Sequence, residues 1–313
     1  MGKHAKPVTG EAARLRRRTK LRDLRVSRLS LYRYRDAVAL FTVYCLQVFG
    51  FLARSLDELD AMGVEFIESC WEEMEPKSLV STTLAGIQHF LQRKRCLPRS
   101  WWTLSTWNLH DLPARAPPIP ALLAYASAGK ALADQLPGVA AAVALGFAGF
   151  LRTGEILGCQ FGHVALFEEA AIVSLPFTKM GRRRGAEEMV AVECPIAIAL
   201  FILASAGRYP HEYLAVTPQF FREWWRASMQ TFDLDADVWR PYGLRRGGAT
   251  HHFRLFGQLE TTIFKGRWGS SITARTYIVE AMSVLARSQL DIASKLLAIG
   301  YLRLLFDTLA GTS

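Results

Sequence analysis

The amino-acid sequence predicts a mainly α-helical protein with a small antiparallel β-sheet, an α+β fold divided into two domains. Apolar residues recur at helical spacing over most of the chain, whereas only one pair of short segments has the character of a β-hairpin. A cluster of prolines interrupts the helical pattern once. Half of the 313 residues are apolar, which excludes a wholly disordered chain.

A basic segment precedes the helical pattern. Residues 1–35 contain 12 of the 38 Lys and Arg but two of the 28 Asp and Glu, so they account for the whole net charge of +10. We interpret them as a flexible arm, because no apolar period persists there. Such an arm binds phosphates, acts as a localisation signal or is simply solvated, and its composition alone does not choose among these.

The composition argues against a membrane or secreted protein. The longest apolar run, residues 136–151, contains Pro137 and is followed at once by Arg152, so we interpret it as a buried helix. The basic N-terminus has no apolar stretch behind it, so we expect no secretory signal. The cysteines are odd in number and form no CxxC pair, which is typical of thiols in a reducing compartment and not of a metal site. They are Cys45, Cys70, Cys96, Cys159 and Cys194.

Residues 36–112 predict a first helical domain. An apolar helical face begins at Asp36, a second helix follows Ser55, which is a typical N-cap residue, and a third begins near Ser78. Four prolines within residues 113–120 cannot continue a helix and favour an extended linker. We therefore place the domain boundary in this linker.

Residues 121–313 predict a second, larger domain that contains the hairpin. Two segments with strand character, 171–175 and 188–192, flank a basic turn that carries Lys179. Helical spacing continues to the C-terminal region, with one break expected near Gly300. The expected helices span residues 121–132, 139–149, 196–206, 218–231, 243–256 and 284–309.

Two features of this domain are chemically notable, although each has an ordinary explanation. Arg152 follows an apolar helix, with Glu155 three residues later. The residue either faces a functional cleft or forms a structural ion pair with that carboxylate. Lys179 lies in a turn, where a lysine is normally solvated.

Two further features follow along the chain. Arg245 and Arg246 open a predicted helix, whose N-terminal amides also favour an anion, and a solvated face is the alternative. Trp268 and Tyr277 are ordinary core residues when each is considered alone.

Considered together, the order and spacing of these residues resemble the tyrosine recombinase (phage integrase) family. That family's motif is an Arg with a Glu three residues later, a hairpin Lys, a His-x-x-Arg box, a His or Trp, and a Tyr nine residues on. The resemblance covers about residues 36–300 and is strongest over 145–280, with 23 residues from Arg245 to Trp268 and nine from Trp268 to Tyr277. The matching residues are Arg152, Glu155, Lys179, Tyr242, Arg245, Trp268 and Tyr277.

The resemblance implies a two-domain DNA clamp, with a helical core-binding domain over residues 36–112 and a catalytic domain over 121–313. In this interpretation Tyr277 attacks a DNA phosphate and forms a 3′-phosphotyrosine, while Arg152 and Arg245 bind the nonbridging oxygens. The bond energy is kept in the phosphotyrosine, so the reaction needs no ATP. Two arginines and a lysine supply the positive charge, so it needs no metal either, and we expect no cofactor. The resemblance assigns three further roles: Lys179 as the acid for the leaving 5′-oxygen, Trp268 as an indole donor and Glu155 as the group that orients Arg152.

One position departs from the family's pattern. Tyr242 occupies the first position of the His-x-x-Arg box, where the family has His. A tyrosine, with a pKa near 10, is a poor base at neutral pH. We therefore expect Tyr242 to donate a hydrogen bond to a phosphate oxygen and not to transfer a proton.

The resemblance also implies partners. The expected partner is double-stranded DNA. Four copies of the chain are expected to form a homotetramer on paired DNA sites, in which the apolar C-terminal segment of each copy docks on a neighbour. Packing of that segment on its own domain is the alternative. We expect an intracellular protein located with DNA, in the nucleus of a eukaryote or otherwise in the cytoplasm or nucleoid. The expected phosphate contacts are Arg93, Lys94, Arg95, Arg182, Arg183, Arg184, Arg240 and Arg246.

Three alternatives to a recombinase stay open at this point. A type IB topoisomerase shares the fold and the chemistry but acts on one duplex. A recombinase-derived DNA-binding protein that no longer cuts is compatible with Tyr242. A basic helical scaffold without nucleic-acid chemistry is the third. The amino-acid sequences of the motifs around Arg152 and Arg245 resemble those of recombinases of eukaryotic mobile elements.

Overall fold

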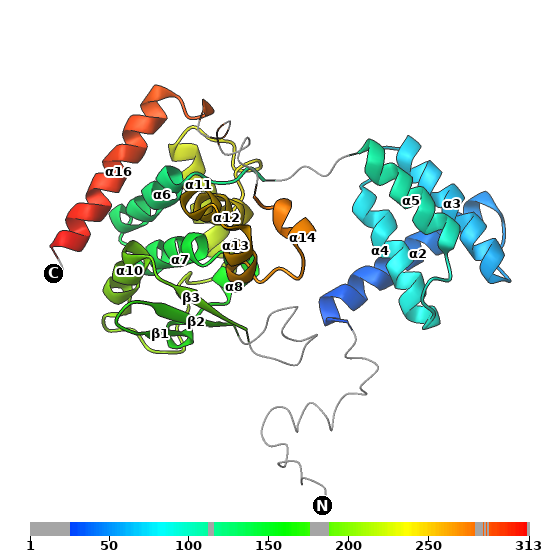
Figure 1. Ribbon diagram of the computed structural model, residues 1–313. Helices are drawn as coiled ribbons and strands as arrows, with labels where there is room; N and C mark the ends of the chain where they lie inside the picture. Colours follow the sequence, from blue (N-terminus) through cyan, green and yellow to red (C-terminus); the bar gives the residue numbers. More distant parts are fainter. Residues whose placement is uncertain are drawn as a thin grey trace, which may run out of the picture. The chain divides into compact units, whose positions relative to one another are not determined.

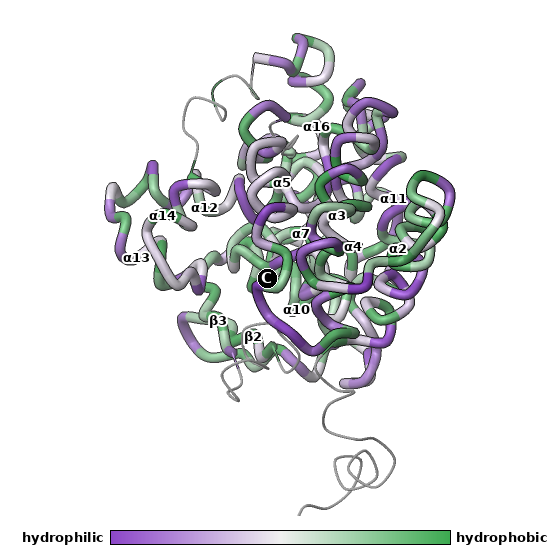
Figure 2. The backbone as a smooth tube through the Cα atoms, turned by 90° about the vertical axis from the view of Figure 1, so that its right-hand side faces the viewer, coloured by the Kyte–Doolittle hydropathy of each residue, from purple (hydrophilic) through white to green (hydrophobic). Residues whose placement is uncertain are grey.

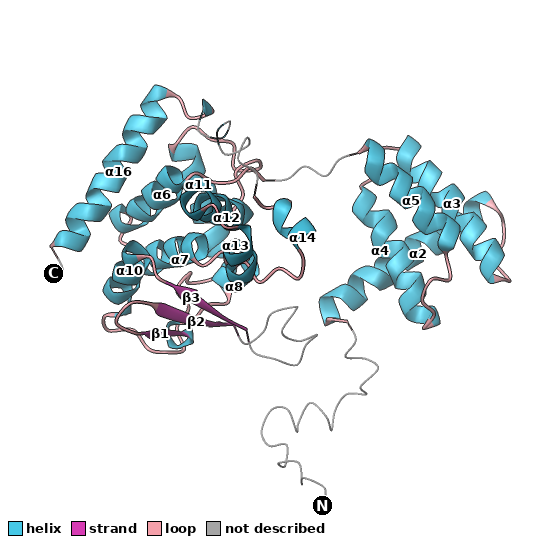
Figure 3. Ribbon diagram, viewed as in Figure 1, coloured by secondary structure: helices cyan, strands magenta, loops and turns pink. Residues whose placement is uncertain are grey.

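The structure, a computed structural model, describes residues 26–111, 116–175, 188–278, 284, 286 and 288–311 (Figure 1). In this part of the chain helices dominate and the strands form one three-stranded antiparallel sheet (Figure 3). The predicted fold class, mainly α with a small antiparallel sheet, is therefore confirmed. The chain divides into two compact units, Met1–Ala114 and Arg115–Ser313.

The first unit is a bundle of helices around one apolar core. Buried aromatic residues on different helices meet there, with the rings of Phe41 and Phe66 5.2 Å apart at an edge-to-face angle. The first helix begins at Arg28 and not at Asp36, because the Ser27 side chain accepts from the Ser30 amide and caps it. The described helices of this unit are α2 (Arg28–Val48), α3 (Leu56–Glu72), α4 (Lys77–Leu91) and α5 (Pro98–His110).

The second unit packs helices around α7 (Pro137–Ala148). This helix consists almost entirely of small and apolar residues and is hydrophobic along most of its length (Figure 2). A helix that is apolar all round is stable only when it is covered on all sides. The helices packed against it are α6 (Ala121–Ala133), α8 (Thr153–Leu157), α10 (Pro195–Ser205) and α12 (Tyr242–Phe256).

The sheet contains the predicted hairpin and one additional strand. β2 (Ala171–Leu175) and β3 (Glu188–Val192) pair antiparallel, with Val173 opposite Val190. The additional strand, β1 (Val164–Leu166), is short and exposed, and for this reason its sequence has no clear alternation. The turn between β2 and β3, with Lys179 and Arg182–Arg184, lies outside the described residues. The remaining elements are η2 (Phe161–His163), α11 (Pro218–Thr231), α13 (Leu259–Lys265), α14 (Ser271–Arg275) and α16 (Ile292–Ala310).

The second half of the proline-rich linker is part of the second unit. Residues 117–120 are buried, and the Ile119 amide donates to the carbonyl of Gly243 at 3.1 Å. Extended prolines therefore pack along α12 instead of serving as a solvated spacer. This contact fixes the end of α12 from which the Tyr242-x-x-Arg245 box projects.

Two glycines allow α12 to approach its neighbours closely. A Cβ atom at Gly247 would collide with the Ile119 carbonyl, and one at Gly248 would collide with the Phe147 carbonyl of α7. The Arg-Arg-Gly-Gly sequence therefore places Arg245 directly against the end of α7. Close packing, and not an unusual backbone angle, is the reason for glycine here.

The C-terminal helix differs from the sequence prediction. α16 continues through Gly300 without the expected break and packs along α6 of its own unit. Gly300 is tolerated in the helix because packing on α6 outweighs the low helix propensity of one glycine. None of the described helices is long and apolar enough to cross a membrane.

Gly248→Ala should destabilise the protein by about 1–3 kcal/mol, because the added methyl group forces α12 away from α7. Gly300→Ala is the matched control, since nothing lies within 4 Å of a Cβ atom at that position. It should stabilise the protein by roughly 0.5–1 kcal/mol through helix propensity. Denaturant unfolding of both variants measures the two effects, and equal stabilities would contradict the packing argument.

Candidate active site

The second unit brings together the residues that the sequence singled out from three separate segments. Arg152 and Glu155 lie at the start of α8, directly after α7. Arg245 lies in the first turn of α12. Trp268 and Tyr277 come from the segment around α14.

Tyr277 is held by a short helix and by the flat side chain of Trp268. The helix α14 begins at Ser270, whose hydroxyl accepts from the Thr273 amide, and the Tyr277 amide donates to the Ala274 carbonyl at 2.9 Å. The Tyr277 ring lies 4.8 Å from the Trp268 ring, at an angle of 32°. This packing fixes the orientation of the ring and hence the position of its hydroxyl.

The Tyr242 hydroxyl donates a hydrogen bond to the Tyr277 hydroxyl at 2.7 Å. Burial opposes ionisation of Tyr277, but this bond and the positive charges of Arg245 and Arg152 hold its pKa below the ordinary value of 10. Burial and the same bond raise the pKa of Tyr242 to about 12. The pair therefore consists of a protonated donor and a tyrosine whose phenolate is favoured.

Arg245 is fully buried, and two carbonyls and two aromatic rings contact its guanidinium. Its guanidinium donates to the carbonyls of Phe150 and Gly266 and lies 5.0 Å from the Trp268 ring and 5.2 Å from the Tyr277 ring. Burial and the charges of Arg152 and Arg267 lower the pKa of Arg245 to about 10. The group is thus still a cation at neutral pH.

An unusual backbone places the two carbonyls that hold Arg245. Phe150 has φ +48° and Arg267, which follows Gly266, has φ +56°. The left-handed conformation costs a residue with a side chain roughly 1 kcal/mol. Burying an unpaired arginine would cost more, so these two turns are stable because they supply acceptors to Arg245.

Arg152 is the more exposed of the two arginines. Its Nη1 atom lies 2.6 Å from Glu155 Oε1, and its backbone amide donates to Glu155 Oε2 at 2.8 Å. Burial raises the pKa of Glu155, but the bonds and charges of Arg267 and Arg152 outweigh it and lower the pKa. A third of the Arg152 side chain is exposed, and its charge acts on Tyr277.

Arg267 is a site residue that the sequence did not indicate. It forms ion pairs with Glu155 at 2.8 Å and with Glu188 at 3.4 Å. Its position directly before Trp268 was the available signal, but an arginine in a loop is normally a surface residue. Only the fold brings the two carboxylates to it.

Several buried donors of the site have no hydrogen-bond partner within the described residues. They are Nε of Arg245, Nε of Arg267 and Nε1 of Trp268. Leaving such a group unpaired costs about 1–3 kcal/mol. An anion with several oxygens, such as a phosphate, is a chemical group that satisfies the Arg245 and Trp268 donors together. A cavity of about 210 Å³, lined by Tyr242, Arg246, Thr276 and Tyr277, lies beside the tyrosine pair.

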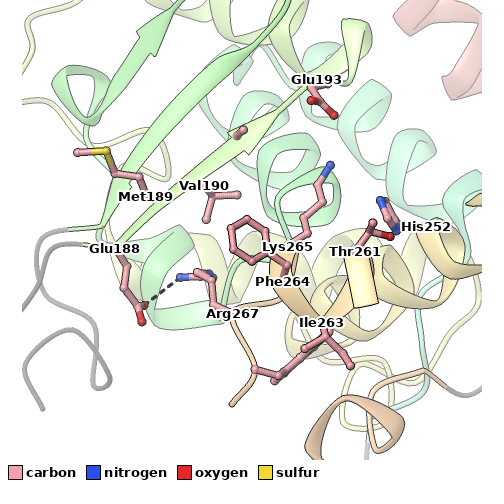
Figure 4. Close-up of a pocket in the computed structure, with 12 residues that line it drawn as sticks. Glu188, Met189, Val190, Glu193, His252, Thr261, Ile263, Phe264, Lys265 and Arg267 are labelled. Atoms are coloured by element: carbon pink, nitrogen blue, oxygen red, sulfur yellow. Dashed lines mark hydrogen bonds and ion pairs between the residues drawn. The ribbon is translucent and has the colours of Figure 1, made fainter. Parts of the chain in front are cut away.

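Behind the site lies a second cavity of about 530 Å³, between β3 and α13 (Figure 4). Its walls are mainly apolar, with Val190 and Ile263 among them. Arg267 and Glu188 form their ion pair at one end of this cavity (Figure 4). Among the described residues no cluster of three His, Cys, Asp or Glu side chains is arranged to hold a metal ion.

The remaining predicted residues lie in different settings. Arg93, Lys94 and Arg95 are exposed between α4 and α5, and Arg240 is exposed before α12. Lys179 and Arg182, Arg183 and Arg184 lie outside the described residues.

Arg246, which we expected to contact phosphate, is not a solvated surface residue. Its side chain is 4% exposed, donates to the carbonyls of Ala116 and Thr276, and lines the small cavity beside Tyr277. It points inward because the buried linker packs on that side of α12. Its described contacts join the linker to the segment that carries Tyr277.

No protein-family model matches the chain, and neither does any curated protein. Solved structures do match. XerA recombinase is 15% identical, with 85% of this chain and 93% of that one covered and a TM-score of 0.42. XerH site-specific recombinase bound to palindromic difH substrate, a post-cleavage complex, is 11% identical, with coverages of 83% and 78% and a TM-score of 0.51. Its pre-cleavage complex with difH is 12% identical, with coverages of 82% and 77% and a TM-score of 0.51.

The similarity to XerH shows that this chain has the tyrosine recombinase fold. The resemblance stated from the motifs is thereby confirmed at the level of the fold. At identities of 11% and 12%, this similarity concerns the fold alone.

Tyr242→Phe should raise the pKa of Tyr277, because it removes the hydroxyl that stabilises the phenolate while burial still opposes ionisation. Titration of phenolate absorbance, compared with Tyr277→Phe to isolate this ring, measures the shift. Tyr209→Phe, at an exposed tyrosine, is the control and should leave it unchanged. A Tyr277 pKa that stays constant in Tyr242→Phe would show that the hydrogen bond does not act on the nucleophile.

Proposed function

We propose that this chain, which has the tyrosine recombinase fold, is a site-specific DNA recombinase that cleaves and rejoins DNA through a 3′-phosphotyrosine. The observation that supports it most directly is the placement of the Tyr277 hydroxyl beside Arg245 and Tyr242. A nucleophile, cations and unpaired donors are what attack on a phosphodiester requires.

In the proposed reaction the Tyr277 oxygen attacks phosphorus and the bond to the 5′-oxygen breaks. The lowered pKa of Tyr277 favours the phenolate that attacks. Arg152 and Arg245 stabilise the charge that develops on the nonbridging oxygens. Attack of the free 5′-hydroxyl on the phosphotyrosine reverses the step and rejoins the strand, so no cofactor is called for.

Three further residues assist in this proposal. Lys179 supplies the proton to the leaving 5′-oxygen, and Trp268 donates its indole N–H to a phosphate oxygen. Tyr242 donates a hydrogen bond, as expected from its pKa, but its partner in the structure is the Tyr277 hydroxyl. Tyr242 thus lowers the pKa of the nucleophile where the family's histidine is absent.

The proposed substrate is double-stranded DNA. The XerH structures contain a difH substrate, and the exposed basic loop of the first unit here suits phosphate contacts. The basic arm and Arg240 add to this set, and Arg246 reaches DNA in this proposal only through the cavity beside Tyr277 that it lines. We propose a homotetramer on paired sites, although α16 packs on its own unit in the isolated chain.

A DNA-binding protein that no longer cuts is the second candidate. Tyr242 at the histidine position favours it, whereas the lowered pKa of Tyr277 favours the enzyme. Wild-type protein that binds a selected site but forms no adduct on its nicked form would establish the second candidate. Relaxation of supercoiled DNA without exchange between paired sites would instead indicate a type IB topoisomerase.

Tyr277→Phe should abolish the covalent adduct on a nicked DNA site while leaving DNA binding intact, because only the hydroxyl is lost. Binding is measured by gel shift on a site obtained by in vitro selection, and the adduct by denaturing electrophoresis. Tyr301→Phe is the control and should keep the adduct. An adduct in the Tyr277→Phe variant would assign the nucleophile to another residue.

Lys179→Ala should slow cleavage by roughly 10²–10⁴-fold, the usual effect of losing an acid catalyst. A substrate with sulfur in place of the leaving 5′-oxygen should restore the rate, since a thiolate leaves without a proton. The same substrate should not restore Arg245→Ala, which lacks a cation and not an acid. If Lys179→Ala cleaves the sulfur-containing substrate as slowly as the ordinary one, Lys179 only contacts DNA.

A further inference from the structure

Arg267 lies between two carboxylates that the fold brings to it from different segments. Its Nη2 atom is 2.8 Å from Glu155 Oε2, and its Nη1 atom is 3.3 Å from Glu155 Oε1 and 3.4 Å from Glu188 Oε2. The side chains of all three residues are about one-tenth exposed. Ion pairs so well shielded from water are stronger than surface pairs.

The neighbours of Arg267 in the chain contact the other arginine of the site. The carbonyl of Gly266 accepts from Arg245 Nη2 at 2.7 Å, and the ring of Trp268 lies 5.0 Å from the Arg245 guanidinium. Residues 266–268 therefore touch Arg245 directly and reach Arg152 through the carboxylate of Glu155.

The geometry at Glu155 shows what Arg267 does for Arg152. Both Glu155 oxygens are occupied by Arg267, and the Arg152 side chain contacts only one of them, through Nη1. Without Arg267, Arg152 is the one remaining arginine among the described residues in hydrogen-bond contact with the buried Glu155 carboxylate. A bidentate pair is the preferred geometry of arginine with a carboxylate, so Arg152 would turn fully onto Glu155.

We propose that Arg267 is a positioning residue that occupies Glu155 and thereby leaves the outer part of the Arg152 guanidinium for the scissile phosphate. This inference rests on the proposed function. The lowered pKa of Glu155 agrees with it, because Arg267 makes the largest favourable contribution to the ionised carboxylate. Arg267 itself does not touch the reacting atoms in this assignment.

The backbone at Arg267 provides a clean way to remove its side chain. Its φ of +56° lies in the left-handed region, which glycine adopts without cost. Arg267→Gly therefore relieves the backbone while it removes the guanidinium. A residue needed only for the shape of the loop would tolerate this change.

The experiment compares adduct formation on a nicked selected site by wild type, Arg267→Gly, Arg152→Ala and the double variant. Arg267→Gly should slow cleavage by about 10²-fold, the usual effect of a misplaced catalytic group, with DNA affinity close to wild type. Loss of the shielded ion pairs should lower its unfolding midpoint, so all variants are compared at a temperature at which each is folded. The double variant should be no slower than Arg152→Ala, because Arg267 acts through Arg152. Arg267→Lys should be intermediate, since an ammonium neutralises Glu155 but does not hold both oxygens.

Arg208→Gly is the matched control, because it removes an exposed ion pair with Glu212 at 3.1 Å and should leave cleavage unchanged. Arg267→Gly with wild-type cleavage would overturn the positioning role while the proposed function stands. Rate losses that multiply in the double variant would also overturn it, since they indicate independent actions. Wild type that forms no adduct at all would overturn the proposed function and this role together.

Discussion

The burial of the Arg245 charge is the constraint on which the rest of the site depends. A fully buried guanidinium is stable only when acceptors and aromatic faces surround it. Two carbonyls and two rings provide these contacts. They belong to Phe150 after α7, to Gly266 and Trp268 before α14, and to Tyr277 after it. The contacts that stabilise this one arginine thus bring together Tyr277, the Trp268 indole and the segment whose Arg267 pairs with Glu155.

The same requirement explains the strained backbone and the close packing around the site. Left-handed turns at Phe150 and Arg267 accompany the carbonyls that bind Arg245. Gly247 and Gly248 let α12 approach Ile119 and Phe147 closely enough to deliver the side chain. The unfavourable backbone conformations persist because the carbonyls that they position bind a buried charge.

The Tyr242–Tyr277 pair explains physically how a tyrosine can occupy position 242, where the family's box has histidine. A phenol at position 242 has a pKa of about 12 and stays protonated, so it is suited to donate and not to accept a proton. Its donation to Tyr277 acts with Arg245 and Arg152 in favour of the phenolate. In the proposed reaction, this hydrogen bond to Tyr277 takes the place of the chemistry that a histidine would offer.

The sequence by itself determined the fold class and the principal residues of the candidate site, because helical periodicity, strand alternation and motif spacing are local properties of the chain. Only the tertiary structure decided which charges are buried. Arg246 and Arg267 look like surface residues in the sequence, yet linker packing buries the first and two distant carboxylates bind the second. The Tyr242–Tyr277 bond joins residues 35 positions apart. Such contacts depend on how the segments pack, and no local pattern records them.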